Sequence, residues 1–268
     1  MADTEVSWED FKKEAASLAD RARDEGSIVL FRGQASSEWR LQTTLERSGL
    51  LEEVADYYRT ALRVKPEVEA YTGLTWSDEP SIYEIERDVL AGYDTFSSVM
   101  LRGSLPHYSY LAYLRHHGFP SPLLDWSASA MVAAFFAFRG ADAENVAIYA
   151  FRERDASGMK TGGSDEPVIR LLGPYVAAPK RHFAQRSYYT VCTQWQEVSP
   201  YFLEHTNVCK PFDPKADFQQ DILFKFVLSN SQRREVIREL AEYNLSAYTL
   251  FGSEEGLMES LAMRAEFD

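Results

Sequence analysis

Cysteine and long apolar runs are both scarce in this 268-residue chain. Its two cysteines, Cys192 and Cys209, are too few for a disulfide framework, which disfavours the small secreted class. The longest apolar run, around Met131 to Phe138, is far shorter than the roughly 20 residues that a membrane span needs. No hydrophobic stretch follows Met1, so we expect no secretory signal. These absences predict a cytoplasmic protein without a membrane partner.

Basic residues are also in the minority. The chain has 28 lysines and arginines against 41 acidic residues, which gives a formal net charge of -13. Such a charge repels polyanions at long range and disfavours a broad nucleic-acid footprint, although it allows a local basic cleft. The cations gather in two groups, namely Lys180, Arg181, His182 and Arg186, and Arg32, Arg40, Arg47 and Arg102. Any single one of them is more simply interpreted as a solvated or salt-bridged surface cation.

The motifs of several common enzyme classes are missing. The sequence has no Gly-x-Ser-x-Gly elbow, Walker loop, Gly-x-Gly-x-x-Gly fingerprint or Cys-x-x-Cys pair. Cys192, His205 and Cys209 do not have the spacing of a common zinc site, so we expect no metal. Serine hydrolases, P-loop enzymes, Rossmann dehydrogenases and zinc proteins are therefore disfavoured.

What the sequence does contain is typical of a globular protein. Apolar residues make up 45% of it and aromatic residues 13%, and its length suffices for one large domain. Helical patterns cover 8–25, most of 49–98 with an irregular part from Val64 to Pro80, 106–116, 231–243 and the segment after Ser253. Strand patterns cover 27–31, 146–151, 168–172, 187–195 and 219–228. The sequence predicts an α+β fold with a mixed or antiparallel sheet, as a single domain with a helical insert at about 49–105.

The stretch from His116 to Ser127 joins a helix end to a strand. Gly118 suits the left-handed position that ends a helix, and Pro120 and Pro122 prevent the helix from resuming. Leu123 and Leu124 then form too short a run for anything but a buried strand or corner. We expect Asp125 or Ser127 to cap the apolar helix from Ala128 to Phe138. Polar groups held at such a buried helix start either satisfy the backbone or bind a ligand.

This stretch resembles the pattern of the FRG-domain family, roughly His-x-Gly-x-Pro-Thr-x-Leu-Leu-Asp-Trp-Thr before an Ala/Phe-rich helix. The Phe-Arg-Gly that names the family stands at Phe31-Arg32-Gly33, before Gln34. Further matching pieces, which extend the resemblance over nearly the whole chain, are Trp39-Arg40-Leu41-Gln42, Glu86 with Leu90 and Phe96, Arg181 to Tyr188, and Thr249 to Leu257. The chain departs from the pattern at Ser121 and Ser127, where Thr is usual, at Pro122, where Arg is usual, and after Phe251, where Pro-Asp is usual.

The order Arg32, Ser127, Gln185 is also similar to the Arg–Ser–Glu layout of ADP-ribosyltransferases, an analogy at the level of the fold. In that layout the Arg holds the phosphates or ribose of the dinucleotide, the Ser braces the site, and a late Glu steadies an oxocarbenium-like cation. Gln185 is neutral and stabilises such a cation far less than a carboxylate. Another residue must therefore supply negative charge, and the candidates are Asp125 first and Glu86 second.

The resemblance thus implies two sets of site residues. His116 falls on the histidine of the family pattern and can provide a base, although a histidine at a helix end more simply favours the dipole. Trp126 or Tyr188 can stack on nicotinamide or adenine. The catalytic candidates are Arg32, Asp125, Gln185, His116 and Glu86. The candidates for binding the dinucleotide are Arg32, Gly33, Gln34, Trp126, Ser127 and Tyr188.

The function implied by the resemblance is an NAD-dependent ADP-ribosyltransferase, with NAD as substrate, no metal, and a core of the ADP-ribosyltransferase type. We expect a toxin or anti-phage defence effector that modifies a nucleic acid or a protein, with an antitoxin or regulatory protein as a further partner. One alternative is an NAD glycohydrolase that releases free ADP-ribose. Another is a non-catalytic module that binds a nucleotide or protein, in which Asp125 and Ser127 are helix caps and Trp126 is part of the core.

Overall fold

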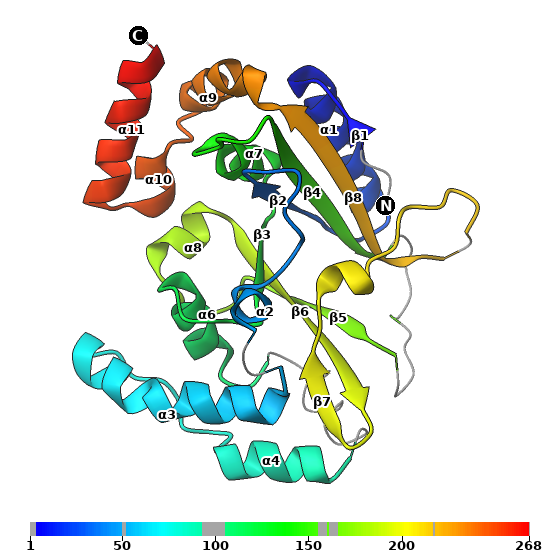
Figure 1. The fold of residues 1–268 in the computed structure, drawn as a ribbon, viewed down its shortest axis with the longest axis vertical. Helices are drawn as coiled ribbons and strands as arrows, with labels where there is room; N and C mark the ends of the chain where they lie inside the picture. The colour runs from blue at the N-terminus through cyan, green and yellow to red at the C-terminus, as the bar shows by residue number, and fades with distance from the viewer. Residues whose placement is uncertain are drawn as a thin grey trace.

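A mixed sheet runs through the computed structural model, which describes residues 4–49, 52–92, 105–154, 160, 166–216 and 218–267 (Figure 1). In the described chain the strand order is β1-β8-β4-β2-β3-β6-β5, and β7 pairs with β6. β1 pairs with β8 in parallel, and the other pairs of named strands are antiparallel. The strands are β1 (Thr4–Glu5), β2 (Val29–Gln34), β3 (Leu124–Ser127), β4 (Asn145–Arg154), β5 (Val168–Leu172), β6 (Ser187–Gln196), β7 (Ser199–Phe202) and β8 (Gln220–Ser229). The expected α+β class with a mixed, mainly antiparallel sheet is confirmed.

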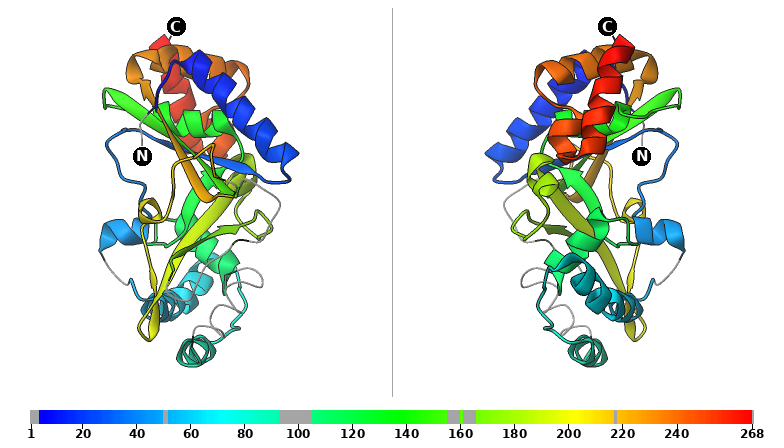
Figure 2. Two further views of the ribbon diagram at one scale, coloured as in Figure 1. Left: turned by 90° about the vertical axis from the view of Figure 1, so that its right-hand side faces the viewer. Right: turned by 90° about the vertical axis from the view of Figure 1, so that its left-hand side faces the viewer.

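The helices form two groups, one at one end of the molecule and one that extends from its middle to the other end (Figures 1 and 2). One end holds α1 (Trp8–Asp24), α7 (Ala130–Phe138), α9 (Arg233–Glu242), α10 (Ala247–Phe251) and α11 (Glu254–Phe267). Toward the other end lie α2 (Thr44–Ser48), α3 (Val54–Thr72), α4 (Ile82–Leu90), α6 (Tyr108–His116) and α8 (Lys180–Ala184). Two short 3-10 helices are η1 (His205–Asn207) and η2 (Asn230–Gln232). None of the helices among these residues is long and apolar enough to cross a membrane.

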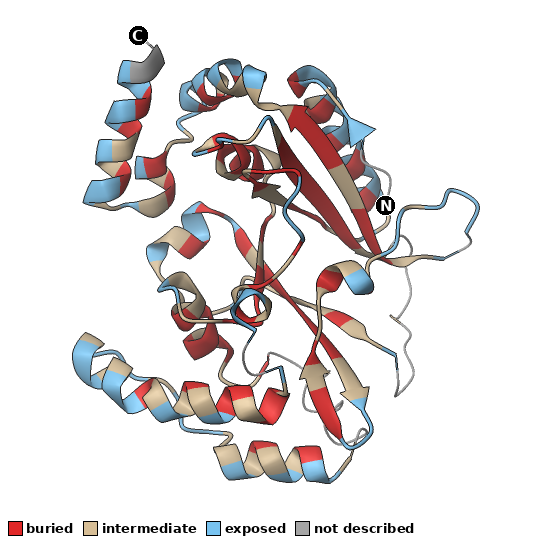
Figure 3. Cartoon of the chain, in the orientation of Figure 1, coloured by how far each residue is buried: buried red, intermediate tan, exposed pale blue. Residues whose placement is uncertain are grey.

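Successive side chains of each strand point to opposite faces of the sheet, and both faces contribute to the apolar core. β4 and β8 are buried along most of their length, as Figure 3 shows. One core cluster joins one face of β2, β4 and β8 to α1, α7 and α9, and a second joins α3, α4 and α6 to β6. A third cluster occupies the opposite face of the sheet and includes Leu30, Trp126 and Tyr149. The sheet is therefore covered on both faces.

The sheet has two halves that meet at one residue pair. β2 pairs with β4 over the whole of Val29–Gln34, and β3 pairs with β6 over the whole of Leu124–Ser127. β2 and β3, however, pair at Phe31 and Ser127 alone. Beyond this pair the two strands lack a shared ladder, and the side chains of Arg32 and Asp125 connect them instead.

Gly33 lets α7 lie directly against β2. A Cβ atom on Gly33 would lie 1.9 Å from the carbonyl oxygen of Ala133 and 2.6 Å from the backbone nitrogen of Ala137. No side chain fits in that space, so the close contact between the helix and the strand requires glycine. The packing of α7 accounts for this residue.

Two local predictions from the sequence are wrong. Asp125 and Ser127 do not cap the helix, because β3 pairs with β6 as far as Ser127 and holds both residues in a strand. Ser129 is the N-cap of α7, and its side chain accepts from the backbone of Val132.

The stretch predicted to be irregular from Val64 is helical as far as Thr72, with Pro66 inside α3. Lys65 anchors this part of α3 to the segment that follows the helix. Its side chain is buried, donates to the carbonyl of Trp76 at 2.9 Å and pairs with Asp78. Phe96 and Arg102 lie outside the described residues.

Substituting Gly33 with Ala should lower the free energy of unfolding by about 1–3 kcal/mol, because α7 must move away from β2 to admit the methyl group. Gly140→Ala is the matched control, since a Cβ there meets nothing within 4 Å. Urea unfolding of the two variants measures the effect. Equal stabilities for the two variants would contradict the close contact.

Candidate functional site

A cavity of about 710 Å³ lies where β2 and β3 separate. Seven of the residues predicted from the sequence line it: Arg32, Gly33 and Gln34 from β2, Asp125, Trp126 and Ser127 from β3, and Gln185 from the end of α8. The loop after β2 and Arg47 in the last turn of α2 supply further walls. The two strands with the specific motifs thus line one cavity.

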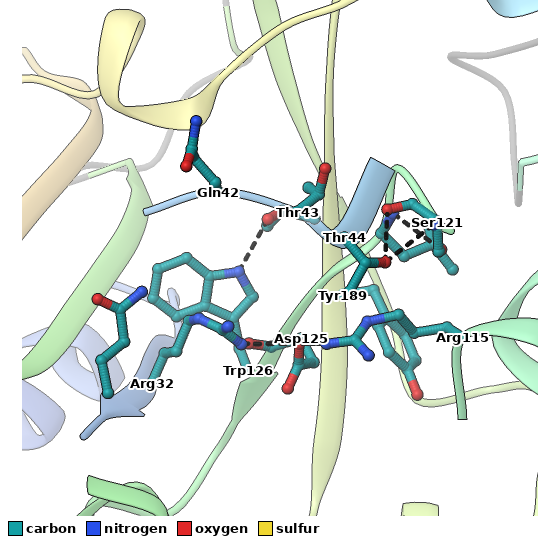
Figure 4. Close-up of polar contacts among 12 residues, drawn as sticks. Arg32, Gln42, Thr43, Thr44, Arg115, Ser121, Asp125, Trp126 and Tyr189 are labelled. Atoms are coloured by element: carbon teal, nitrogen blue, oxygen red, sulfur yellow. Dashed lines mark hydrogen bonds and ion pairs between the residues drawn. The ribbon is translucent and has the colours of Figure 1, made fainter. Parts of the chain in front are cut away.

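Asp125 is held between two arginines that approach it from opposite sides (Figure 4). The Nη1 atom of Arg32 lies 2.7 Å from Oδ1 of Asp125 and donates to its backbone carbonyl at 2.9 Å. Arg115 forms an ion pair with the same carboxylate oxygen from the last turn of α6. These side chains link the two halves of the sheet at the point where the backbone ladder is missing.

The Asp125 carboxylate stays ionised. Burial by itself would raise its pKa, but Arg115 and then Arg32 hold the pKa well below its usual range. The side chain nevertheless keeps 45% of its exposure, so the carboxylate also faces the opening of the cavity. A ligand that enters here meets a fixed negative charge flanked by guanidinium groups.

Trp126 has one polar contact and is otherwise part of the core. Its indole N–H donates to Oγ1 of Thr190 at 2.8 Å, and that oxygen lies 2.8 Å from Nε2 of His205. Burial lowers the pKa of His205 to about 3, so its ring is neutral near pH 7. This buried chain fixes the indole in the cavity wall.

Ser127 and Gln185 brace the cavity through the backbone. The Ser127 hydroxyl donates to the carbonyl of Gln185 at 2.7 Å and accepts from the backbone N–H of Ser129 at 3.0 Å. The amide nitrogen of Gln185 donates to the carbonyl of Leu250 at 3.1 Å. Ser127 therefore ties β3 to α7 and to the end of α8.

Three predicted site residues do not line the cavity. Glu86 is on α4, where it pairs with Arg59 of α3. The Nε2 atom of His116 lies 2.8 Å from the hydroxyl of Tyr189, and burial, followed by Arg181, lowers the pKa of His116 to about 3. Tyr188 pairs across the strands with Trp126 and packs against the core on that face.

Several cavity residues were missed as site residues. Arg40 and Arg47 were noted in the sequence as cations near Arg32, and Arg40 also as part of the family piece from Trp39 to Gln42, but neither was named as a site residue. All three arginines line the cavity. The pKa of Arg47 is lowered by burial and then by Arg32 and Arg115, as expected for neighbouring cations. Glu38 and Trp39 also line it, and no described residue forms an ion pair with Glu38. The match to the family pattern that begins at Trp39 could have indicated that this loop belongs to the site.

The other basic group, near Arg181, does not line the cavity. Arg181 donates to the backbone carbonyl of His116, and His182 is buried beside Tyr189. The cavity itself therefore combines the guanidinium groups of Arg32, Arg40 and Arg47 with the carboxylates of Asp125 and Glu38. Such a site suits an anionic ligand with a reacting centre that becomes positive.

Comparison with known families supports one assignment. The FRG domain model matches residues 27–146, a range that contains Arg32, Arg115 and the segment from Asp125 to Ser127. No curated protein and no solved structure matches the chain.

Substituting Asp125 with Asn should destabilise the protein at pH 7 by about 1–3 kcal/mol, because two guanidinium groups lose their shared carboxylate. The matched control is Glu86→Gln, which breaks a more exposed pair and should cost much less. A carboxyl with a depressed pKa stabilises the fold above its unfolded pKa of about 3.9 and loses that contribution at lower pH. Chemical unfolding should thus show the difference between the wild type and Asp125→Asn shrinking steadily as the pH falls below about 4, toward the depressed pKa of the folded state. A difference that stays constant as the pH falls through this range would contradict the ion pairs.

Substituting His205 with Gln should make stability less sensitive to acid. Its folded pKa of about 3 lies below the unfolded value, so only the unfolded state takes up the proton as the pH falls from about 6.5. Over that range the wild type should lose up to about 1.4 kcal/mol per pH unit more than the variant. Unfolding curves between pH 6.5 and 4 measure this difference, and parallel pH profiles would contradict a buried neutral His205.

Proposed function

Because the chain carries an FRG domain, we propose that it is an NAD-dependent ADP-ribosyltransferase whose active site is the cavity between β2 and β3. One observation gives this proposal its main support. Arg32 and Asp125 meet across the split in the sheet, beside Arg40 and Arg47, and so combine a phosphate-binding group with an ionised carboxylate.

The arginines account for the diphosphate of NAD. Guanidinium groups bind phosphate oxygens through paired N–H donors, and Arg32, Arg40 and Arg47 line one cavity in a chain of net charge -13. Because the rest of the chain repels anions, this local charge would give the cavity its selectivity. Its volume of about 710 Å³ is within the range of pockets that bind small molecules and cofactors.

The carboxylates account for the chemistry at the ribose. In ADP-ribosyl transfer the bond between C1′ and the pyridinium nitrogen breaks, its electron pair goes to that nitrogen, and neutral nicotinamide leaves. The positive charge then develops on the ribose, where Asp125 and Glu38 would stabilise it. Gln185 would contribute hydrogen bonding alone, since its amide carries no charge.

The remaining walls suit the rings of the dinucleotide. Phe136 lines the cavity and offers aromatic surface to nicotinamide or adenine, whereas Trp126 is 3% exposed and forms only part of the wall. The biological setting implied by the family resemblance belongs to the same proposal: a cytoplasmic toxin or anti-phage effector with a macromolecular acceptor, restrained by an antitoxin or regulatory protein.

The test is incubation of the purified protein with NAD labelled on the adenylate, in a cell lysate. Removing a carboxylate that stabilises the transition state should slow NAD turnover by about 100- to 1,000-fold in Asp125→Asn and in Glu38→Gln. Glu38 is exposed, so its variant should fold as the wild type does. Glu86→Gln is the matched control and should keep full turnover.

The outcomes separate the proposal from its alternatives. Label on a macromolecule that is lost in both carboxylate variants would support the transferase. Free ADP-ribose without labelled acceptor would indicate a glycohydrolase. NAD that raises the melting temperature without being consumed would indicate a binding module and would overturn the proposal.

A further inference from the structure

A second cavity, of about 480 Å³, adjoins the first. The two cavities share Glu38, Trp39 and Arg40, so this loop forms a common wall. The far side of the second cavity consists of Tyr149 and Lys225 on adjacent strands and of Thr206 and Asn207 in η1. None of these four residues lines the first cavity.

Trp39 presents its indole on this common wall. The side chain is 58% exposed, although the backbone around it is anchored: the Trp39 carbonyl accepts from the hydroxyl of Tyr149 at 3.4 Å, and its N–H donates to Ser36 at 3.4 Å. A single exposed aromatic residue is ordinary in itself. This one, however, stands at a fixed place between two cavities, which suits it to stack on a flat ligand.

Arg40 adds a cation beside the indole. Its side chain is 64% exposed, and its Nη2 atom lies 2.7 Å from Oε2 of Glu204. Glu204 also accepts from the amide of Gln42, which fixes the carboxylate and through it the guanidinium. The exposed guanidinium is thus fixed in position before a ligand arrives.

We propose that the second cavity binds a base of a single-stranded nucleic acid, and that this base is the acceptor of the ADP-ribosyl group. The base stacks on Trp39, and Arg40, which lines both cavities, contacts the adjoining phosphate as well as the diphosphate of NAD. Stacking of a base on an aromatic side chain beside a cation is the usual mode of binding to single strands. The acceptor role rests on the proposed function, whereas the binding of the base does not.

A single strand fits this surface better than a duplex. The net charge of -13 opposes contact with many phosphates, and the common wall offers one exposed arginine. Recognition must then depend on stacking in place of a broad electrostatic contact. Affinity should accordingly vary little with salt, with a slope of about -0.7 to -1.4 for one or two phosphates.

Glu38 lies where the two ligands would meet. It lines both cavities, is exposed, and forms no ion pair with a described residue. A nitrogen or oxygen of the base attacks C1′ as the bond to nicotinamide breaks. Its proton passes to Glu38, and neutral nicotinamide departs with the electron pair of the broken bond. The step needs no oxidant or reductant.

The experiment is fluorescence anisotropy with labelled single-stranded DNA and RNA of mixed sequence, about 12 nucleotides long, in the absence of NAD. Trp39→Ala should weaken binding of the favoured strand at least about tenfold, and Trp39→Phe should keep it within about threefold, because phenylalanine still stacks. Tyr71→Ala is the matched control for a lost exposed aromatic side chain, since Tyr71 is 94% exposed on α3. It should bind as the wild type does.

A second readout separates this inference from the proposed function. Binding that depends on Trp39, in a protein that does not consume NAD, would support the base site and reject only the transferase. NAD-derived label on the bound oligonucleotide would support the acceptor role. Absence of binding, equal affinity for Trp39→Ala and Tyr71→Ala, or label on protein alone would overturn the inference.

Discussion

The cavity depends on the ion pairs that hold Asp125 between Arg32 and Arg115. β2 and β3 share one backbone pair, at Phe31 and Ser127, so these side chains connect the two halves of the sheet next to the opening. A continuous ladder here would have closed the sheet and left no space for a ligand. The same contacts keep the carboxylate ionised and direct two guanidinium groups toward it. Local stability and the polarity of the site therefore have one physical origin.

Much of the fold could be predicted from local patterns. The helical pattern over 8–25 predicted α1, and the apolar run after Ser127 predicted the buried helix α7. Short elements such as β7 and α10 were missed, because a few residues carry little periodic signal. The cap of α7 was misplaced because pairing with β6 is a long-range interaction, and it holds Asp125 and Ser127 in a strand.

Site residues could be predicted where a motif lies on a single strand. They could be predicted less well where groups that are far apart in the sequence come together. Arg32 and the segment from Asp125 to Ser127 line the cavity because each motif is on a strand beside the split. Arg115 could not be identified, because nothing in its sequence says that α6 turns it toward Asp125. Glu86 matched a family position, yet it pairs with Arg59 at a distance from the cavity, since a helix face can satisfy a carboxylate locally.

The central claim is that the cavity between β2 and β3 holds a dinucleotide. The most direct measurement is a crystal structure of the protein with ADP-ribose, the part of NAD that carries both phosphates. We expect the diphosphate among Arg32, Arg40 and Arg47, with the terminal ribose facing Asp125 and Glu38. A diphosphate bound elsewhere, with this cavity still filled by solvent, would contradict it.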